Sequence, residues 1–408
     1  PAPTMPQIWS MAVVHTGVPA SSPVARAAAG EPFAIRLKVP ENGRTAFEDQ
    51  VYGIQERDYA DTEDLVLLRS DGHPLYNLAV VCDDIEMQIT HVIRGQDHLT
   101  NTHKQILIYE AIGVTPPVFA HLPLIMAPNK GKLSKRKHGE IVSMTTYRDA
   151  GFIAAAFRNF LALLGWSASE EKEIYSMEEL IEKFSLEGIH RSNAVFNFHE
   201  GDPRKWTDDK ALWMNAEYIR TMPLVELLPH VKNELKAAKL WRDEYDEWET
   251  FARDQHGEDR QERLRERVAL SGPLEIGSAE WLVYTVDLIR QRFWTLEDFV
   301  VQGAAYLSDR VEYDPAAVKK NLAKNPRTGP LLNELANRFE AVPFDHESLE
   351  AALRGYAEEE GVGAGLLING LRTAVTGYAV GPSAFELCLA LGRERVLHRL
   401  RHLPALEG

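Results

Sequence analysis

The segment Lys132–Gly139, with the sequence KLSKRKHG, constrains this 408-residue chain more than any other. In a chain whose formal net charge is −15, it belongs to a cluster of five cations: Lys130, Lys132, Lys135, Arg136 and Lys137. A local basic island in an acidic protein can hold a polyphosphate. Ser134 adds a hydroxyl donor, and Gly131 and Gly139 let the backbone approach a ligand closely. The preceding Pro128-Asn129 predicts a loop, and a solvated basic loop or a targeting patch is the alternative.

Two further motifs lie upstream of this segment. One begins at Ser70 and reads SDGHPLYNLAVVCDD, and the other begins at Ile89 and reads ITHVIRGQDHL. The three blocks, in this order, resemble the glutamyl-tRNA synthetases among the class I aminoacyl-tRNA synthetases, whose KMSKS loop has the form KLSKR in the glutamyl branch. The resemblance extends from about Glu31 to His402 and therefore covers most of the chain.

This resemblance implies an α/β fold joined to an all-α region. We expect five segments: a divergent N-terminal segment (1–30), a remnant of the acceptor-binding insertion (31–78), the second half of a doubly wound, Rossmann-like nucleotide-binding fold that carries the KLSKR loop (79–144), a helical stem-contact domain (145–222) and an α-helical anticodon-binding domain (223–408). The helical carboxyl-terminal half favours the glutamyl enzymes, because glutaminyl-tRNA synthetases carry β-barrels there and glutamyl-queuosine synthetases lack the region.

The residues themselves predict several of these elements. Alternating apolar and polar residues between 33 and 66 indicate β-structure, and the chain is helical in pattern from Thr145 onward. Four short segments have a definite interpretation: strands at Leu65–Arg69 and Leu78–Cys82, a helix at Asn101–Ile112 ended by Gly113, and a last parallel strand at His121–Met126 that leads into the basic loop.

The first thirty residues do not fit the family pattern. The resemblance implies a HIGH-type tetrapeptide after the first strand, and His15-Thr16-Gly17 is the nearest candidate, with one histidine instead of two. The chain also begins with proline. We therefore expect a truncated or frame-disrupted copy that lacks the first half of the nucleotide-binding fold. A polar stretch at Phe198–Trp206 departs from the family as an apparent insertion.

The resemblance implies an activity in two steps, in which ATP activates L-glutamate and the product is transferred to the 3′ end of tRNA(Glu). Lys132 and Lys135 are the predicted catalytic residues, because fixed cations stabilise the charge that spreads over phosphate oxygens. We expect ATP to be bound by Lys135, Ser134 and backbone groups of Leu124 and Ile125. Mg²⁺ is expected to accompany ATP as a charge-screening partner.

Selection of glutamate requires a group that recognises its side-chain carboxylate. Arg94 is the predicted residue, because a guanidinium can pair with a carboxylate through two parallel hydrogen bonds. An ion pair of Arg94 with Asp83 or Asp84 is the alternative. Tyr76 resembles the substrate-contacting tyrosine of the family, and a core tyrosine with a satisfied hydroxyl is its alternative.

Two charged residues are candidates for contacts with tRNA or with the ATP ribose. Asp97 is expected to position the acceptor adenosine or that ribose, and Arg136 to support the loop or meet tRNA phosphate. The helical periodicity of Arg393–His402 buries its apolar residues and places its basic residues on the outward face. This face is a possible tRNA contact or a solvated surface.

Composition sets the remaining limits. No apolar run approaches 18 residues, so no membrane association is expected, and cytoplasm and a monomer are the default expectations. Cys82 and Cys388 lie in apolar stretches and are predicted to be buried free thiols. The sequence has no Cys/His cluster with metal-ligand spacing, so no zinc is expected.

Three alternatives to the expected ligase stay open. A catalytically inactive tRNA-binding fragment follows if the nucleotide-binding fold is incomplete. A non-discriminating enzyme would charge tRNA(Gln) as well as tRNA(Glu). A synthetase-like ligase could charge glutamate onto another acceptor, although the long helical region argues against that.

Overall fold

The structure is a computed structural model that describes residues 30–168, 171–199, 206–254 and 258–404. Its contacts divide the chain into two units, and the first comprises residues from 1–138 and 161–199. The second comprises residues from 139–160 and 200–408. The candidate His15-Thr16-Gly17, and all of 200–205 within the expected polar insertion, lie outside the described residues.

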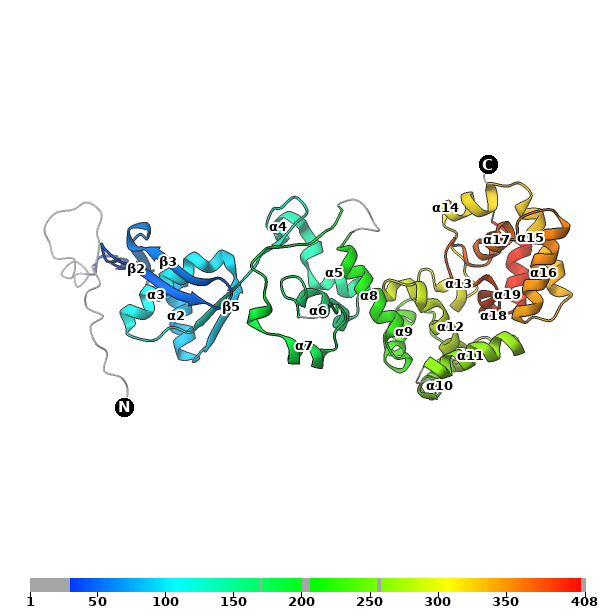
Figure 1. The fold of residues 1–408 in the computed structure, drawn as a ribbon, viewed down its shortest axis with the longest axis horizontal. Coiled ribbons are helices and arrows are strands. Elements are labelled where there is room, and N and C mark those ends of the chain that lie inside the picture. The colour runs from blue at the N-terminus through cyan, green and yellow to red at the C-terminus, as the bar shows by residue number, and fades with distance from the viewer. Residues whose placement is uncertain (1–29, 169–170, 200–205, 255–257, 405–408) are drawn as a thin grey trace. The chain divides into compact units, whose positions relative to one another are not determined.

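A four-stranded sheet forms the centre of the first unit (Figure 1). Its strand order is β3-β2-β6-β5, where the strands are β2 (Arg44–Asp49), β3 (Gly53–Asp58), β5 (His91–Gly95) and β6 (Val118–Leu122). Strands β2 and β3 form an antiparallel hairpin, and β6 runs parallel to both β2 and β5. The parallel pair β5–β6 is joined by helix α3 (Leu99–Ile112), as parallel strands require a crossover connection.

Local sequence signals predicted one of the two helices beside this sheet and not the other. Helix α3 has the predicted periodicity and ends at Gly113, whose φ of 77° suits a left-handed C-cap. The predicted strand at Leu78–Cys82 is wrong, because these residues lie inside helix α2 (Tyr76–Glu86). Val81 is the one fully buried residue of α2, and Leu78, Val80 and Ile85 pack partly buried against the same apolar cluster, so a short apolar run concealed a helix. The expected domain limit after residue 78 falls inside this helix.

Two small sheets complete the β-structure. Strands β1 (Ile35–Leu37) and β4 (Leu65–Leu68) pair antiparallel, which agrees with the β-structure predicted for 33–66. The single strand predicted at His121–Met126 is wrong. It is split into the end of β6 and a separate strand β7 (Ile125–Met126), which pairs with β8 (Ala194–Val195). Pro123 stands at the break, where it has no N–H to continue a ladder.

The second unit is helical, as expected. It is built around one apolar cluster whose central residues include Leu282, Leu332, Leu371 and Leu400. Helix α17 contacts α15, α16, α18 and α19, which Figure 1 shows packed together. The helices of this unit are α5 (Met144–Asp149), the first part of α6 (Ala154–Ala162), α8 (Asp209–Thr221), α9 (Leu224–Ala237), α10 (Trp248–Asp254), α11 (Glu258–Ser271), α12 (Ala279–Ile289), α13 (Ala304–Leu307), α14 (Pro315–Val318), α15 (Thr328–Glu340), α16 (His346–Glu359), α17 (Ala364–Thr376), α18 (Ala384–Leu391) and α19 (Arg393–Arg401).

Short helical segments connect these elements. The first unit also contains α4 (Lys135–His138) and α7 (Met177–Lys183), and α7 begins with a reciprocal capping box between Ser176 and Glu179. The 3₁₀ and π segments are η2 (Tyr59–Asp61), η3 (Gln96–His98), η4 (Gly139–Val142), η5 (Leu186–Gly188), η6 (Asp243–Tyr245), η7 (Arg290–Arg292), η8 (Leu296–Phe299) and η9 (Lys319–Ala323). Throughout the described ranges, every helix falls short of the length and apolarity that a membrane span requires.

Helix α19 only partly follows its prediction. Val396 and Leu400 are buried as expected, but Arg399, predicted to face outward, is 5 % exposed. Its guanidinium donates hydrogen bonds to the carbonyl oxygens of Ala305 and Val375, both at 2.7 Å. Carbonyls near helix ends lack intrahelical partners, so a buried guanidinium can satisfy them. Arg399 therefore ties helices together and cannot serve as a nucleic-acid contact.

The two cysteines differ in their surroundings. Cys388 is buried, as predicted, and burial raises the pKa of its thiol. Cys82 is exposed, so its predicted burial is wrong. It follows Val81 on α2 and points away from the core that Val81 enters, because neighbouring residues of a helix lie on different faces.

Candidate active site

The candidate site lies at the carboxyl end of β5, beside its parallel neighbour β6. Arg94 stands next to last in β5 and is in register with His121 of β6. Gly95 then ends the strand, and the chain turns through η3 into α3. Ligands of open parallel sheets bind at this end of the strands, which is where the sequence places the predicted carboxylate-binding arginine.

The guanidinium of Arg94 is held by neutral partners. Its Nη2 donates to the Thr102 hydroxyl at 2.6 Å and to Gln105 Oε1 at 2.7 Å. Its Nε donates to His121 Nε2 at 3.3 Å. Gln105 in turn donates to Asn77 Oδ1 at 3.2 Å, so α2, α3, β5 and β6 all contribute to the orientation of one side chain.

The alternative ion pair of Arg94 with Asp83 or Asp84 is not formed. Within the described part of the chain, Arg94 has no carboxylate as an ion-pair partner, and Asp84 instead accepts a hydrogen bond from the Tyr109 hydroxyl at 3.3 Å. Burial lowers the pKa of Arg94, and the interactions with Tyr76 and Asp84 partly offset this lowering. An arginine remains protonated in proteins, so its positive charge is available to an anionic ligand.

Tyr76 is the first residue of α2, and its hydroxyl partly offsets the lowering of the Arg94 pKa by burial. It is 51 % exposed, so the alternative of a buried core tyrosine is wrong. Its ring lies 6.3 Å from the His98 ring, centroid to centroid. The phenol is thus at the surface of the site, where a ligand can reach it.

Asp97 and Lys132 meet although 35 residues separate them in sequence. Lys132 Nζ lies 2.5 Å from Asp97 Oδ2, and this contact lowers the pKa of the carboxyl group. Both side chains are partly exposed, at 53 % for Lys132 and 36 % for Asp97. Gly95 makes room for the turn, since a Cβ there would stand 2.6 Å from Asp97 Oδ1. The ion pair joins the basic loop to the carboxyl end of β5.

Lys135 and Arg136 of the basic loop differ from Lys132 in their contacts. Lys135 and Arg136 are exposed and form no ion pair or hydrogen bond with a side chain in the described ranges. Ser134 precedes α4, and its backbone N–H donates to His138 Nδ1 at 3.1 Å. The His138 ring also packs edge-on against Phe198 at 5.9 Å. His138 therefore shapes the loop, while Lys135 and Arg136 point into solvent.

The backbone groups predicted to read adenine are already partly engaged. The N–H of Leu124 donates to Asn193 Oδ1 at 2.9 Å, and its carbonyl accepts from Ala194 N–H at 3.1 Å. The carbonyl of Ile125 accepts from Leu133 N–H at 3.0 Å. A carbonyl oxygen has two lone pairs, so both carbonyls can still accept from an amino group, whereas the Leu124 N–H is not free.

The sequence analysis missed the buried pair behind Arg94. Asp49, the last residue of β2, lies 2.6 Å from His121 Nδ1 through its Oδ2, and neither side chain is exposed. It also missed Thr102 and Gln105, which hold the Arg94 guanidinium. The available signal was weak: only His121 stands as a polar residue between apolar ones, and only the fold shows that the four residues converge.

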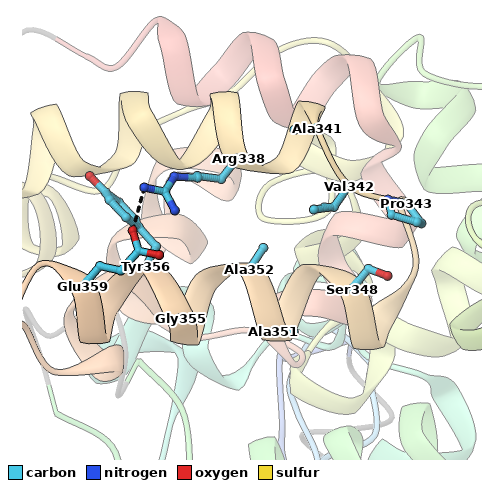
Figure 2. A pocket seen from close by; sticks show the side chains of 10 residues that line it. All are labelled: Arg338, Ala341, Val342, Pro343, Ser348, Ala351, Ala352, Gly355, Tyr356 and Glu359. Atoms are coloured by element: carbon cyan, nitrogen blue, oxygen red, sulfur yellow. Dashed lines mark hydrogen bonds and ion pairs between the residues drawn. The ribbon is translucent and has the colours of Figure 1, made fainter.

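Other features of the described residues do not add a site to this one. They contain no group of three or more His, Cys, Asp or Glu side chains that could hold a metal ion. A groove of about 400 Å³ lies between α15 and α16 (Figure 2). Its one cation, Arg338, lies 4.7 Å from the Tyr356 ring and pairs with Glu359 at 2.8 Å and Glu334 at 3.4 Å, so its charge is neutralised.

Comparison with known proteins defines the class of this molecule. Residues 20–201 match the family "tRNA synthetases class I (E and Q), catalytic domain", and residues 259–404 match an anticodon-binding domain. The chain therefore has the features of a class I tRNA synthetase. These are a parallel strand pair with an arginine at its carboxyl end, a KLSKR loop beside it and a helical region later in the sequence.

Individual relatives narrow this class. The chain is 42 % identical over 380 residues to the glutamate–tRNA ligase of Desulfotalea psychrophila, covering 93 % of this chain and 72 % of the relative. It is 43 % identical over 385 residues to glutamate–tRNA ligase 2 of Koribacter versatilis, covering 94 % and 71 %. The chain belongs to the glutamate–tRNA ligase family.

A solved structure agrees with this assignment. A crystal structure of a glutamate tRNA ligase from Elizabethkingia meningosepticum, in complex with its amino acid, matches with a TM-score of 0.70 and 28 % identity. The match covers 94 % of this chain and 70 % of that chain. The resemblance inferred from the three sequence motifs is therefore confirmed.

Proposed function

We propose that this chain acts as a glutamate–tRNA ligase, which activates L-glutamate with ATP and transfers it to the 3′ end of tRNA(Glu). The observation that carries the proposal is the guanidinium of Arg94. It is held at the carboxyl end of β5 by neutral partners, and no carboxylate of the described residues forms an ion pair with it. Because the chain belongs to the glutamate–tRNA ligase family, we infer that the anion bound at this site is glutamate.

Arg94 is proposed to bind the side-chain carboxylate of glutamate. Because Thr102, Gln105 and His121 engage Nε and Nη2, the guanidinium is oriented before the ligand arrives. A charge-assisted pair with a carboxylate is stronger than a hydrogen bond with a neutral amide, so glutamate is favoured over glutamine. The exposed Tyr76 phenol beside Arg94 can add a hydrogen bond to the same ligand.

The basic loop is proposed to bind the ATP phosphates. Lys135 is the stronger candidate for the catalytic cation, because Lys132 is engaged by Asp97 and would have to exchange that carboxylate for a phosphate. Ser134 and Arg136 are proposed as further contacts of ATP and of tRNA phosphate. The lysine ammonium is a compact charge on a flexible stem, so it can follow the charge that builds on the phosphates during reaction.

The reaction has two displacements. A carboxylate oxygen of glutamate attacks the α-phosphorus of ATP, the bond to the bridging oxygen breaks, and pyrophosphate leaves. A ribose hydroxyl at the tRNA 3′ end then attacks the mixed anhydride, its proton goes to solvent, and AMP leaves. Mg²⁺ bound to ATP supplies additional charge screening. Asp97 is proposed to contact a ribose once Lys132 has moved to phosphate.

The finer domain roles belong to the same proposal. The β5–α3–β6 unit is proposed to belong to the second half of a doubly wound nucleotide-binding fold, and the described residues before helix α2 to the acceptor-binding insertion. Residues 145–222 would contact the tRNA stem, and 223–408 its anticodon. Arg399 is excluded from this contact by its burial, so exposed cations elsewhere on the helical region must meet the phosphates.

The direct test is transfer of radiolabelled amino acid to tRNA by this chain with ATP and Mg²⁺. We expect glutamate to be attached to tRNA(Glu) and glutamine not to be attached. Parallel reactions with tRNA(Gln) decide whether the enzyme discriminates between the two tRNAs. Binding of tRNA(Glu) without any transfer would favour the alternative of an inactive tRNA-binding protein.

A further inference from the structure

A buried acid–histidine pair lies directly behind the proposed glutamate-binding arginine. Asp49 Oδ1 accepts the backbone N–H groups of Val51 at 3.0 Å and Tyr52 at 2.8 Å. Its Oδ2 accepts the backbone N–H of His121 at 3.0 Å and lies 2.6 Å from His121 Nδ1. A buried carboxylate is tolerated when it is fully hydrogen-bonded, so this arrangement is fixed in place.

The contacts determine which ring nitrogen of His121 carries the proton. An ionised carboxylate can only accept hydrogen bonds, so Nδ1, which faces Asp49, must carry the hydrogen. The opposite nitrogen, Nε2, then has a lone pair. The Arg94 Nε–H donates to it at 3.3 Å, and the Thr102 hydroxyl oxygen lies 3.0 Å from it and 3.3 Å from the His98 carbonyl oxygen. His121 thus accepts from Arg94 because Asp49 sets its tautomer.

The same arrangement keeps His121 neutral. A proton on Nε2 would place two donors, Nε2–H and the Arg94 Nε–H, face to face. Burial lowers the pKa of His121, Asp49 opposes this, and Arg94 and His98 lower it further. His103, the other titratable group that interacts with His121 electrostatically, has its own pKa lowered by burial. A neutral imidazole therefore separates the Asp49 charge from the Arg94 charge.

We propose that Asp49 and His121 are positioning residues for Arg94, which orient its guanidinium without neutralising it and thereby make the site select a carboxylate over a carboxamide. This inference rests on the proposed function for the identity of the ligand. A direct Asp49–Arg94 ion pair would orient the guanidinium too, but it would consume the charge that the ligand needs. The imidazole between them transmits orientation only.

The chain offers a matched control for this role. His103 of α3 is also buried, at 7 % exposure, and its Nδ1 lies 2.8 Å from the Thr45 hydroxyl. Its ring packs on Phe47, which also lies near the His121 ring, but it makes no hydrogen bond with Arg94. Asparagine can keep the Nδ1-side hydrogen bond of either histidine while it removes the Nε2 side. His121→Asn therefore tests the contact with Arg94, and His103→Asn tests the general cost of such a change.

The first measurement is nitrogen NMR of the unmodified chain, which does not depend on the folding of a variant. We expect His121 to be neutral with its proton on Nδ1, and the Arg94 Nε–H to exchange slowly with water. We expect His121→Asn to speed this exchange and His103→Asn to leave it unchanged. A proton on Nε2, or equal exchange rates in both variants, would overturn the proposal.

The second measurement is calorimetric titration with L-glutamate and L-glutamine. We expect His121→Asn to weaken glutamate binding roughly tenfold, the scale of one hydrogen bond to a charged group, and to leave the weak glutamine binding unchanged. An unchanged preference for glutamate would overturn the selectivity role. Failure of the unmodified chain to bind glutamate would instead contradict the proposed function, while the NMR result would still decide whether His121 positions Arg94.

Discussion

Replacement of Arg94 by alanine is the perturbation that the site geometry predicts most sharply. The substitution removes a guanidinium whose Nε and Nη2 are already held by three hydrogen bonds, so its binding to a ligand costs little further ordering. Hydrogen bonds to charged groups contribute about 1.5–3 kcal/mol each. Nε and both hydrogens of Nη2 are engaged, so the ligand carboxylate would meet the hydrogens of Nη1. Because the site is partly open to water, we expect a loss of about 2 kcal/mol, or roughly 30-fold in glutamate affinity.

Arg94→Lys separates charge from geometry. It keeps the positive charge but loses the planar fork, so we expect an affinity for glutamate between those of the wild type and Arg94→Ala. Arg44→Ala is the control, because Arg44 lies on the same sheet and forms exposed ion pairs with Glu56 at 2.8 Å and Asp58 at 3.8 Å. We expect it to bind glutamate normally.

The assay is calorimetric titration of the three variants with glutamate, together with glutamate-dependent ATP–pyrophosphate exchange at saturating glutamate. Near-normal binding and exchange by Arg94→Ala would remove this arginine from the site. Equal losses in Arg94→Ala and Arg44→Ala would show that the effect comes from the stability of the sheet.

Three further predictions concern the loop, the tRNA and the helical unit. Lys135→Ala should lower the maximal rate of glutamate activation much more than it weakens ATP binding, because the loop lysine meets charge that builds in the transition state. Pyrophosphate exchange over a range of ATP concentrations measures both effects. A loss confined to ATP affinity would contradict this prediction. Binding of tRNA(Glu) should weaken steeply with salt in a filter-binding series, because phosphate contacts release counterions, and no affinity at low salt would argue against a tRNA partner. Gly377→Ala should destabilise the chain by more than about 3 kcal/mol in urea denaturation, because a Cβ there would stand 1.9 Å from the Glu312 carbonyl oxygen. The φ of Gly361 is also positive, at 61° against 86° for Gly377, but a Cβ there would meet no atom within 4 Å. Gly361→Ala should therefore cost only about 1 kcal/mol, and equal losses would refute the steric argument.

The fold was predictable where local signals agree with packing. Helix α3 has helical periodicity and a glycine that can adopt its left-handed C-cap, so its type and its end were both predicted. Helix α2 was mistaken for a strand because five consecutive apolar residues fit either structure. The strand expected at 121–126 was divided because β7 pairs with β8, which lies almost seventy residues later, and no local signal announces such a partner.

The candidate site was predictable only in its motif residues. Arg94, Asp97 and Lys132 come from two motifs, and the structure joins two of them through the Asp97–Lys132 ion pair. The buried pair Asp49–His121 joins positions 72 residues apart, and neither residue has a neighbour in sequence that marks it. The outward orientation predicted for Arg399 failed for a related reason: the carbonyl oxygens that it satisfies come from other helices.

The account depends most on where the side-chain carboxylate of glutamate binds. A crystal structure of the chain soaked with L-glutamate measures this directly. We expect the side-chain carboxylate within about 3.2 Å of the Arg94 guanidinium, with Tyr76 beside the ligand and the Arg94–His121 contact intact. A glutamate whose side-chain carboxylate lies elsewhere, or an Arg94 that turns away to pair with a protein carboxylate, would contradict the account.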